Sequence, residues 1–137
     1  MVNELANILN CDNIFQNEPL SMHSTFKIGG TCDYLLYPES ISELTSLLKF
    51  LRGNSIPYYV IGNGSNILFS DSGFSGCLIK TSKLGEITVL GNIITSDSGV
   101  MLSKLCDMAV KHSLDGLVSL SGIPGTVGGA VYMNAGA

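Results

Sequence analysis

Glycine is concentrated at the end of the chain, and this concentration constrains the fold more than any other feature. The segment from Ser121 to Ala137 reads SGIPGTVGGAVYMNAGA and holds five glycines in seventeen residues. Glycine loses more conformational entropy on folding than other residues, so such a cluster needs a reason. One reason is a backbone that passes close to a ligand and directs its N–H groups at an anion. The other is a closely packed helix, and the residues alone leave both interpretations open.

A second glycine-rich turn, Gly62-Asn63-Gly64-Ser65-Asn66, follows the apolar run at 58–61. It is not a Walker A sequence, because no Gly-Lys-Ser/Thr follows, and Ile67 breaks the dinucleotide pattern Gly-x-Gly-x-x-Gly. A plain tight turn explains it about as well as contact with a phosphate does. The Ser65 hydroxyl and the Asn66 amide can bond to either a turn or a phosphate oxygen. Two such loops in one short chain indicate a nucleotide held from two sides.

The sequence Ile123-Pro124-Gly125-Thr126 predicts the start of a helix, because proline suits an early helical position. The positive potential at that helix end would suit a diphosphate. Small residues at 128–130 would equally allow a neighbouring element to approach closely.

Hydrophobic periodicity predicts a first α/β lobe over residues 1–75 and the start of a second, α+β lobe over residues 76–137. In the first lobe, Ser40 and Glu43 form a capping box that opens a helix closed by Gly53. A strand at 57–61 then places the glycine turn at its carboxyl end, where open α/β sheets bind ligands. The other predicted elements are a helix at 2–9, strands at 33–37, 77–80, 86–90 and 93–96, and a helix at 101–110.

Composition excludes several functions. A net charge of −4 and a single arginine, Arg52, argue against a nucleic-acid-binding surface. No apolar stretch reaches the roughly 18 residues of a membrane span, and the N-terminus lacks a signal-peptide pattern, so a cytoplasmic protein is expected. The four cysteines have no metal-ligand spacing and are expected to be buried or half-buried free thiols. His23 and His112 have no visible partner and are expected to be structural or at the surface, as is Lys83.

The two glycine segments, together with Ser24-Thr25-Phe26-Lys27-Ile28-Gly29-Gly30, resemble the UDP-N-acetylenolpyruvoylglucosamine reductase family. The three motifs keep the order and approximate spacing of that family, and the resemblance extends over essentially the whole chain. The chain differs at Ser24, where the family motif usually has asparagine.

The resemblance implies an α+β fold: a two-lobed FAD-binding domain of the vanillyl-alcohol-oxidase (PCMH) type, with its second lobe truncated and its substrate-binding domain absent from this chain. It implies non-covalent FAD as cofactor and NADPH as co-substrate. The implied reaction converts UDP-N-acetylglucosamine enolpyruvate to UDP-N-acetylmuramate in peptidoglycan synthesis, and a monomer is expected. The cofactor-binding residues that the resemblance implies are Gly62, Asn63, Gly64, Ser65, Asn66, Leu68, Ser121, Gly122, Ile123, Pro124, Gly125, Thr126, Gly128, Gly129, Ala130, Asn134, Ala135 and Gly136.

Members of this family continue beyond the position of Ala137, and the arginine, glutamate and serine that act on the enol are expected in that part. No catalytic residue or metal ligand is therefore assigned in this chain, and the 137-residue chain alone is expected to be inactive. The alternative is a non-catalytic dinucleotide-binding module or an inactive remnant. Another flavin oxidase of the same fold is a weaker possibility, because no histidine lies near residues 62–66 for covalent attachment.

Overall fold

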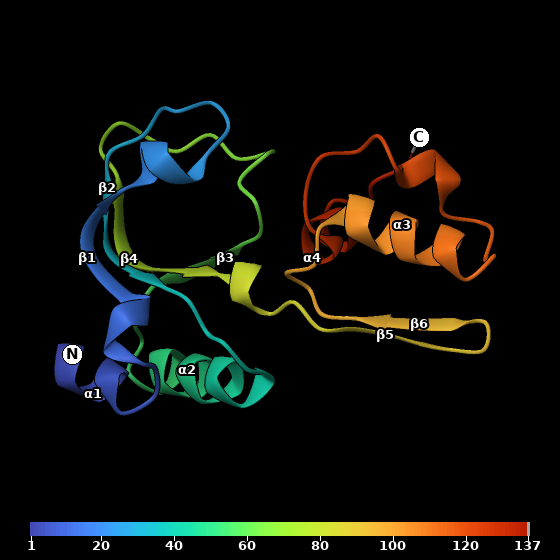
Figure 1. Ribbon diagram of the computed structural model, residues 1–137. Helices are drawn as coiled ribbons and strands as arrows, with labels where there is room; N and C mark the ends of the chain where they lie inside the picture. The colour runs from blue at the N-terminus through green and yellow to red at the C-terminus, as the bar shows by residue number, and fades with distance from the viewer. Residues whose placement is uncertain (137) are drawn as a thin grey trace.

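The computed structural model describes residues 1–136 of the chain. Figure 1 shows two groups of elements, with α1, α2 and β1–β4 in one group and β5, β6, α3 and α4 in the other. The elements in chain order are α1 (Val2–Ala6), η1 (Cys11–Asn13), β1 (Ile14–Pro19), η2 (Leu20–His23), β2 (Thr31–Leu36), α2 (Ile41–Gly53), β3 (Tyr58–Ile61), β4 (Phe74–Lys80), η3 (Thr81–Lys83), β5 (Ile87–Leu90), β6 (Ile93–Ser96), α3 (Leu102–Lys111), η4 (Val118–Leu120) and α4 (Val127–Tyr132), where η denotes a 3-10 helix.

The first group is built on a four-stranded sheet with the order β1-β2-β4-β3. Strands β2, β4 and β3 are parallel, with Tyr34 and Tyr58 both opposite Cys77, whereas β1 is antiparallel to β2. The predicted strand–helix–strand unit is present as β2–α2–β3, but β4 lies between its two strands. Because parallel strands end at the same edge of a sheet, the segments that follow β2, β3 and β4 meet at one end of it.

Two features of this sheet bear on the sequence analysis. The boundary expected after residue 75 falls inside β4, which pairs with β2 and β3 of the first group, so we propose that the first lobe ends after Lys80. The sequence also predicts no strand at β1. This edge strand pairs only with β2, it contains Pro19 and a left-handed Asn17 (φ 52°), and its burial does not alternate.

The two faces of the sheet contact separate apolar clusters. Cys77 and Ile79 of β4 face α1 and α2, where the buried cluster also includes Leu5, Leu9, Leu36, Leu47 and Leu51. Leu78 points to the opposite face, in a cluster with Leu20, Cys32, Leu35 and Ile61. Ile67 and Phe69, which follow the first glycine turn, cover part of this second cluster. The glycine turn therefore belongs to the face of the sheet opposite α2.

Helix α2 begins and ends where the sequence predicts. The Ser40 hydroxyl accepts a hydrogen bond from the Glu43 N–H at 3.1 Å, and Gly53 is the last helical residue. The Glu43 carboxylate accepts from the Glu39 N–H at 2.7 Å, one residue before the position expected for a capping box.

The second group contains the predicted hairpin, formed by β5 and β6, and the predicted helix α3. Gly91 at the hairpin turn has a φ of 58°, in the left-handed region that this tight turn uses. Among the described residues, no helix is long and apolar enough to cross a membrane.

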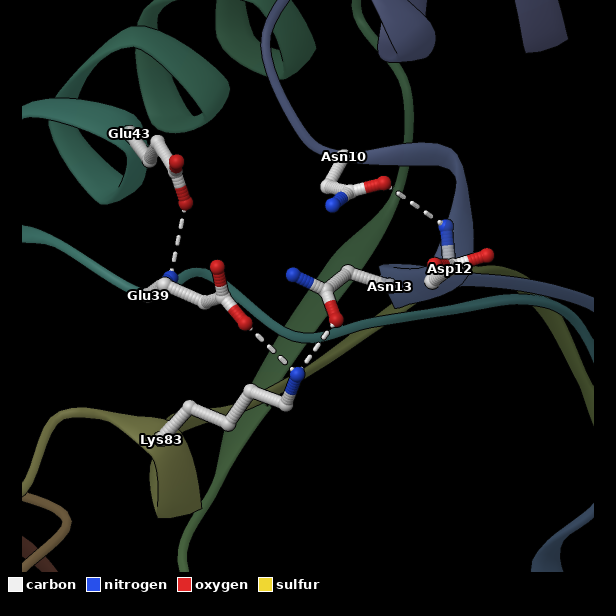
Figure 2. Close-up of polar contacts among 6 residues, drawn as sticks. All are labelled: Asn10, Asp12, Asn13, Glu39, Glu43 and Lys83. Carbon is white, nitrogen blue, oxygen red and sulfur yellow. Dashed lines mark hydrogen bonds and ion pairs between the residues drawn. The ribbon is translucent and has the colours of Figure 1, made fainter.

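Lys83 lies at the surface, as expected, but it connects η1 and the segment after β2 to its own segment, η3 (Figure 2). Its Nζ donates to Asn13 Oδ1 at 2.6 Å and to Glu39 Oε1 at 2.7 Å. The hydrogen bond from Lys83 and the charge of its ammonium lower the pKa of Glu39. A substitution of Lys83 would therefore disturb contacts with η1 and with the segment after β2.

Candidate functional site

The three motifs of the sequence analysis meet at the carboxyl end of β3. We define the first glycine loop as residues 62–66, the second glycine loop as residues 121–130 and the N-terminal motif as residues 24–30. The N-terminal motif contacts the first glycine loop and its continuation, because the Thr25 N–H donates to the Gly64 carbonyl at 3.1 Å and the Ser24 hydroxyl donates to the Ile67 carbonyl at 2.9 Å. Segments forty residues apart in sequence are thereby held together.

The first glycine loop presents a run of free backbone donors. The N–H groups of Asn63, Gly64, Ser65 and Asn66 donate to no protein acceptor within residues 1–136. Asn63 and Asn66 are exposed, Ser65 is half-buried and Gly64 is buried. Successive unpaired N–H groups on a turn are a suitable site for an anion such as a diphosphate.

Gly64 in this loop is required by the fold as well. Its φ is +73°, a conformation that residues with a side chain rarely adopt. A Cβ built on Gly64 would overlap the backbone carbonyl of His23. The glycine therefore allows the loop to rest directly on the residues that precede the N-terminal motif, which is a packing role beside any contact with a ligand.

The second glycine loop lies against the first. The Ser65 hydroxyl donates to the Pro124 carbonyl at 3.1 Å, and a Cβ on Gly62 would overlap the side chain of Thr126, which is buried. At these positions the two loops touch each other directly. A nucleotide held by both loops, as the sequence predicts, would lie beside these contacts.

Helix α4 begins at Val127, three residues after the proline that the sequence places in its first turn. Thr126 is the N-cap residue, and its hydroxyl accepts from the Gly129 N–H at 3.2 Å. The Val127 N–H donates to the Val100 carbonyl at 2.8 Å and the Gly128 N–H to the Ser98 carbonyl at 2.9 Å. Because protein acceptors occupy these three donors, the start of α4 does not offer its free N–H groups to a diphosphate. Gly128 also packs on Ser98, whose Cβ would lie 2.7 Å from an added Cβ.

Apart from Leu68, which follows the first glycine loop, the remaining expected cofactor-binding residues lie in α4 or beside it, at exposed or half-buried positions. Ser121 and Gly122 follow η4, and a Cβ added to Gly122 would meet no protein atom within 4 Å. Asn134, with a φ of 48°, follows Met133, the C-cap residue of α4, and the Ala135 N–H donates to the Ala130 carbonyl at 2.9 Å. Leu68 has 69% of its surface exposed. The structure thus unites the two loops at Gly62, Ser65 and 124–126, and no hydrogen bond within residues 1–136 links 134–136 to the first loop.

The sequence analysis did not identify Glu18 and Lys80, two charged residues near the first loop. It also predicted no partner for His23, which contacts both of them. The His23 Nε2 lies 2.9 Å from Glu18 Oε1, and its Nδ1 lies 3.4 Å from Lys80 Nζ. Lys80 is half-buried, and burial lowers the pKa of its ammonium. The available signal was the place of Lys80 in an otherwise apolar strand, but no local pattern pairs it with a histidine 57 residues away.

Comparison with known proteins relates this geometry to flavoproteins. The family described as FAD binding domain matches residues 32–137. The UDP-N-acetylenolpyruvoylglucosamine reductase of Clostridium tetani is 46% identical over 136 residues, which are 99% of this chain and 44% of that protein. The crystal structure of UDP-N-acetylenolpyruvylglucosamine reductase (MurB) from Thermus caldophilus has a TM-score of 0.69 at 34% identity, covering 90% of this chain and 42% of that one.

The chain therefore spans less than half the length of these relatives. The resemblance to the UDP-N-acetylenolpyruvoylglucosamine reductase family, stated from the sequence, is confirmed. A structure of p-cresol methylhydroxylase is also similar, with a TM-score of 0.65 at 15% identity over 94% of this chain and 28% of that one. At this identity the likeness concerns the fold alone. It confirms the fold class expected from the sequence, a mixed α and β FAD-binding domain of the vanillyl-alcohol-oxidase type.

Proposed function

We propose that this chain, which belongs to the FAD binding domain family, forms the FAD-binding part of an NADPH-dependent UDP-N-acetylenolpyruvoylglucosamine reductase. The reaction would convert UDP-N-acetylglucosamine enolpyruvate to UDP-N-acetylmuramate in peptidoglycan synthesis, in the cytoplasm and in a monomer. The observation that carries the proposal is the meeting of three separate motifs around four unpaired N–H groups at the carboxyl end of a parallel strand. Residues at this place suit the diphosphate of a dinucleotide.

The first glycine loop supplies the anion-binding part of the proposed site. The N–H groups of residues 63–66 would hold the diphosphate, and the exposed Asn66 amide can add a donor. The Ser65 hydroxyl has another role, because its proton is already donated to the Pro124 carbonyl. Ser65 therefore joins the two loops and leaves the diphosphate to the backbone.

The second glycine loop would form the surface along which the rest of the cofactor lies. Gly122 leaves this surface free of a side chain at its exposed end, whereas the buried Thr126 fixes its position against Gly62. FAD, when bound, supplies the hydride chemistry between NADPH and the enolpyruvyl group. The residues of this chain bind and orient it, and Arg52 is engaged elsewhere, with its Nε donating to the Tyr58 hydroxyl at 2.7 Å.

The cofactor assignment is tested with protein purified from the complete reading frame. We expect a yellow protein that releases free FAD on denaturation, which would indicate non-covalent binding. A colourless protein that cannot be reconstituted with FAD would contradict the proposal. Reduced-flavin formation by NADPH and its reoxidation by the enolpyruvyl UDP-sugar would establish the activity. FAD binding without this turnover would instead identify a non-catalytic dinucleotide-binding module.

Substitutions at two glycines can distinguish a loss of cofactor contact from a loss of folding. Gly122 and Gly85 both have ordinary φ values and no protein atom within 4 Å of an added Cβ. Gly122→Val in the second glycine loop is expected to weaken FAD binding about tenfold or more, because a side chain there would displace a closely packed ligand. Gly85→Val, outside both loops, is expected to bind FAD normally. Equal FAD affinity in the two variants would remove Gly122 from the proposed site.

A further inference from the structure

We propose that His23 is a positioning residue for the first glycine loop, held by Glu18 and Lys80 so that the loop keeps the shape that binds a diphosphate. The inference rests on the proposed function, since it concerns the loop to which FAD binding is assigned. It adds three residues, Glu18, His23 and Lys80, that the motifs do not include.

The three side chains come from separate elements and meet on one face of the sheet. Glu18 lies in β1, His23 ends η2, and Lys80 ends β4. Because side chains alternate along a strand, Lys80 shares the face of Leu78, opposite the face that Ile79 turns to α2. Lys80 is also opposite Ile61 in the sheet, the residue directly before the first glycine loop.

One arrangement of protons satisfies both contacts of the imidazole. If Nε2 carries the proton, it donates to Glu18 Oε1 at 2.9 Å, and the lone pair of Nδ1 accepts from the Lys80 ammonium at 3.4 Å. The neutral ring then bridges a carboxylate and an ammonium. The side chains of His23 and Glu18 are only 12% and 25% exposed, so water competes weakly for these contacts.

The backbone at His23 and the two residues after it connects the imidazole contacts to the first glycine loop. Its carbonyl occupies the place where a Cβ of Gly64 would lie. The next two residues donate to the loop segment, Thr25 through its N–H to the Gly64 carbonyl at 3.1 Å and Ser24 through its hydroxyl to the Ile67 carbonyl at 2.9 Å. A change in the position of His23 therefore moves the surface on which the N–H groups of residues 63–66 rest.

The charge of the Lys80 ammonium makes its contact with the His23 imidazole sensitive to acid. A second proton on the imidazole would place an N–H at Nδ1 against the Lys80 ammonium, so that two cations face each other across 3.4 Å. Glu18 on β1 opposes this repulsion, and the same carboxylate faces Cys32 and Tyr37 on the β2 side, whose pKa values are raised by burial and by its charge. The contact between His23 and Lys80 is the one that protonation breaks.

The test uses the complete protein, with FAD affinity measured by titration of the apoprotein at several values between about pH 5 and 8. His23→Leu removes both contacts and is expected to weaken FAD binding about tenfold or more while the apoprotein stays folded. His23→Gln can donate to Glu18 and accept from Lys80. We expect it to retain FAD affinity and to lack the decline at acid pH that we expect of the natural protein.

His112→Gln and His112→Leu are matched controls, because His112 is exposed at the end of α3, and both are expected to leave the pH profile unchanged. Unaltered FAD affinity in His23→Leu, or the same acid decline in His23→Gln and the natural protein, would overturn the positioning role. If His23→Leu does not fold, the pH profile of His23→Gln still decides. Absence of FAD binding in the natural protein would overturn the proposed function itself.

Discussion

At the scale of single residues, the glycines of the two loops have different tasks. Gly64 and Gly62 are glycines because protein atoms occupy the place of a side chain, the His23 carbonyl in one case and the Thr126 side chain in the other. A Cβ added to Gly122 would meet no protein atom within 4 Å, so only a ligand would give a steric reason for a glycine at this position. The same residue type therefore serves packing in one loop segment and accessibility in another.

Gly64→Val is expected to destabilise the protein in the absence of FAD. The sequence alone predicts a loss of flavin affinity, but the positive φ and the overlap with the His23 carbonyl add a cost to the fold itself. We expect a loss of about 3 kcal/mol or more in the free energy of unfolding, measured by urea denaturation of the apoprotein. Gly85→Val should unfold at the same urea concentration as the natural protein. A stable Gly64→Val variant would show that the loop does not rest on His23.

The buried thiols predict how stability changes in alkali. Burial raises the pKa of Cys32 and of Cys77 to about 11, from an ordinary value of 9.0. The folded state therefore holds these protons more tightly than the unfolded chain, so the stabilisation is complete below pH 9 and is lost as the pH rises toward 11. Each thiol is expected to contribute about 2 kcal/mol to this loss. Urea denaturation between pH 8 and 10.5 should show a smaller decline for Cys77→Ala, and an equal decline would contradict the prediction.

At the scale of elements, capping residues next to a helix in the sequence decide where that helix begins. Helix α2 begins at Ile41 because the Ser40 side chain satisfies a backbone donor in its first turn. Helix α4 begins at Val127 because Thr126 supplies the same kind of cap. Pro124 stays outside that helix, and its carbonyl bonds to Ser65 of another loop.

Ser40→Ala is expected to lower the free energy of unfolding by about 1 kcal/mol, because the Glu43 N–H loses its acceptor. Ser46→Ala, at an exposed position within the same helix, should be neutral or slightly stabilising, since alanine favours helix. Thermal unfolding followed by circular dichroism compares the two variants. Equal unfolding temperatures would mean that the cap does not contribute to stability.

At the scale of the whole molecule, the two groups of elements meet through the glycine loops. Ser65 bonds to Pro124, and Gly62 packs on Thr126. Beside them, a polar interaction with Tyr132 of α4 raises the pKa of Tyr59 at the edge of the sheet. The proposed cofactor surface is therefore a property of both groups together.

The 137-residue chain is expected to bind FAD more weakly than the protein from the complete reading frame, because it spans less than half the length of its relatives. It is also expected to oxidise no NADPH in the presence of the enolpyruvyl UDP-sugar, since groups that stabilise a developing oxyanion contribute several kcal/mol. FAD titration and a spectrophotometric NADPH assay on both proteins test these expectations. Substrate-dependent turnover by the short chain would place the catalytic groups within residues 1–137.

The sequence by itself determined the properties that depend on local pattern. The α2 cap at Ser40, the hairpin turn at Gly91, the three motifs and their family resemblance were all readable, because neighbouring residues carry these signals. Only the tertiary structure decided which strands pair, since β4 enters between β2 and β3 and the edge strand β1 has no alternating pattern. It also decided that the two loops touch, that the first donors of α4 are occupied, and that His23 bridges Glu18 and Lys80. Contacts between residues about sixty positions apart depend on chain folding and leave no periodic trace along the sequence.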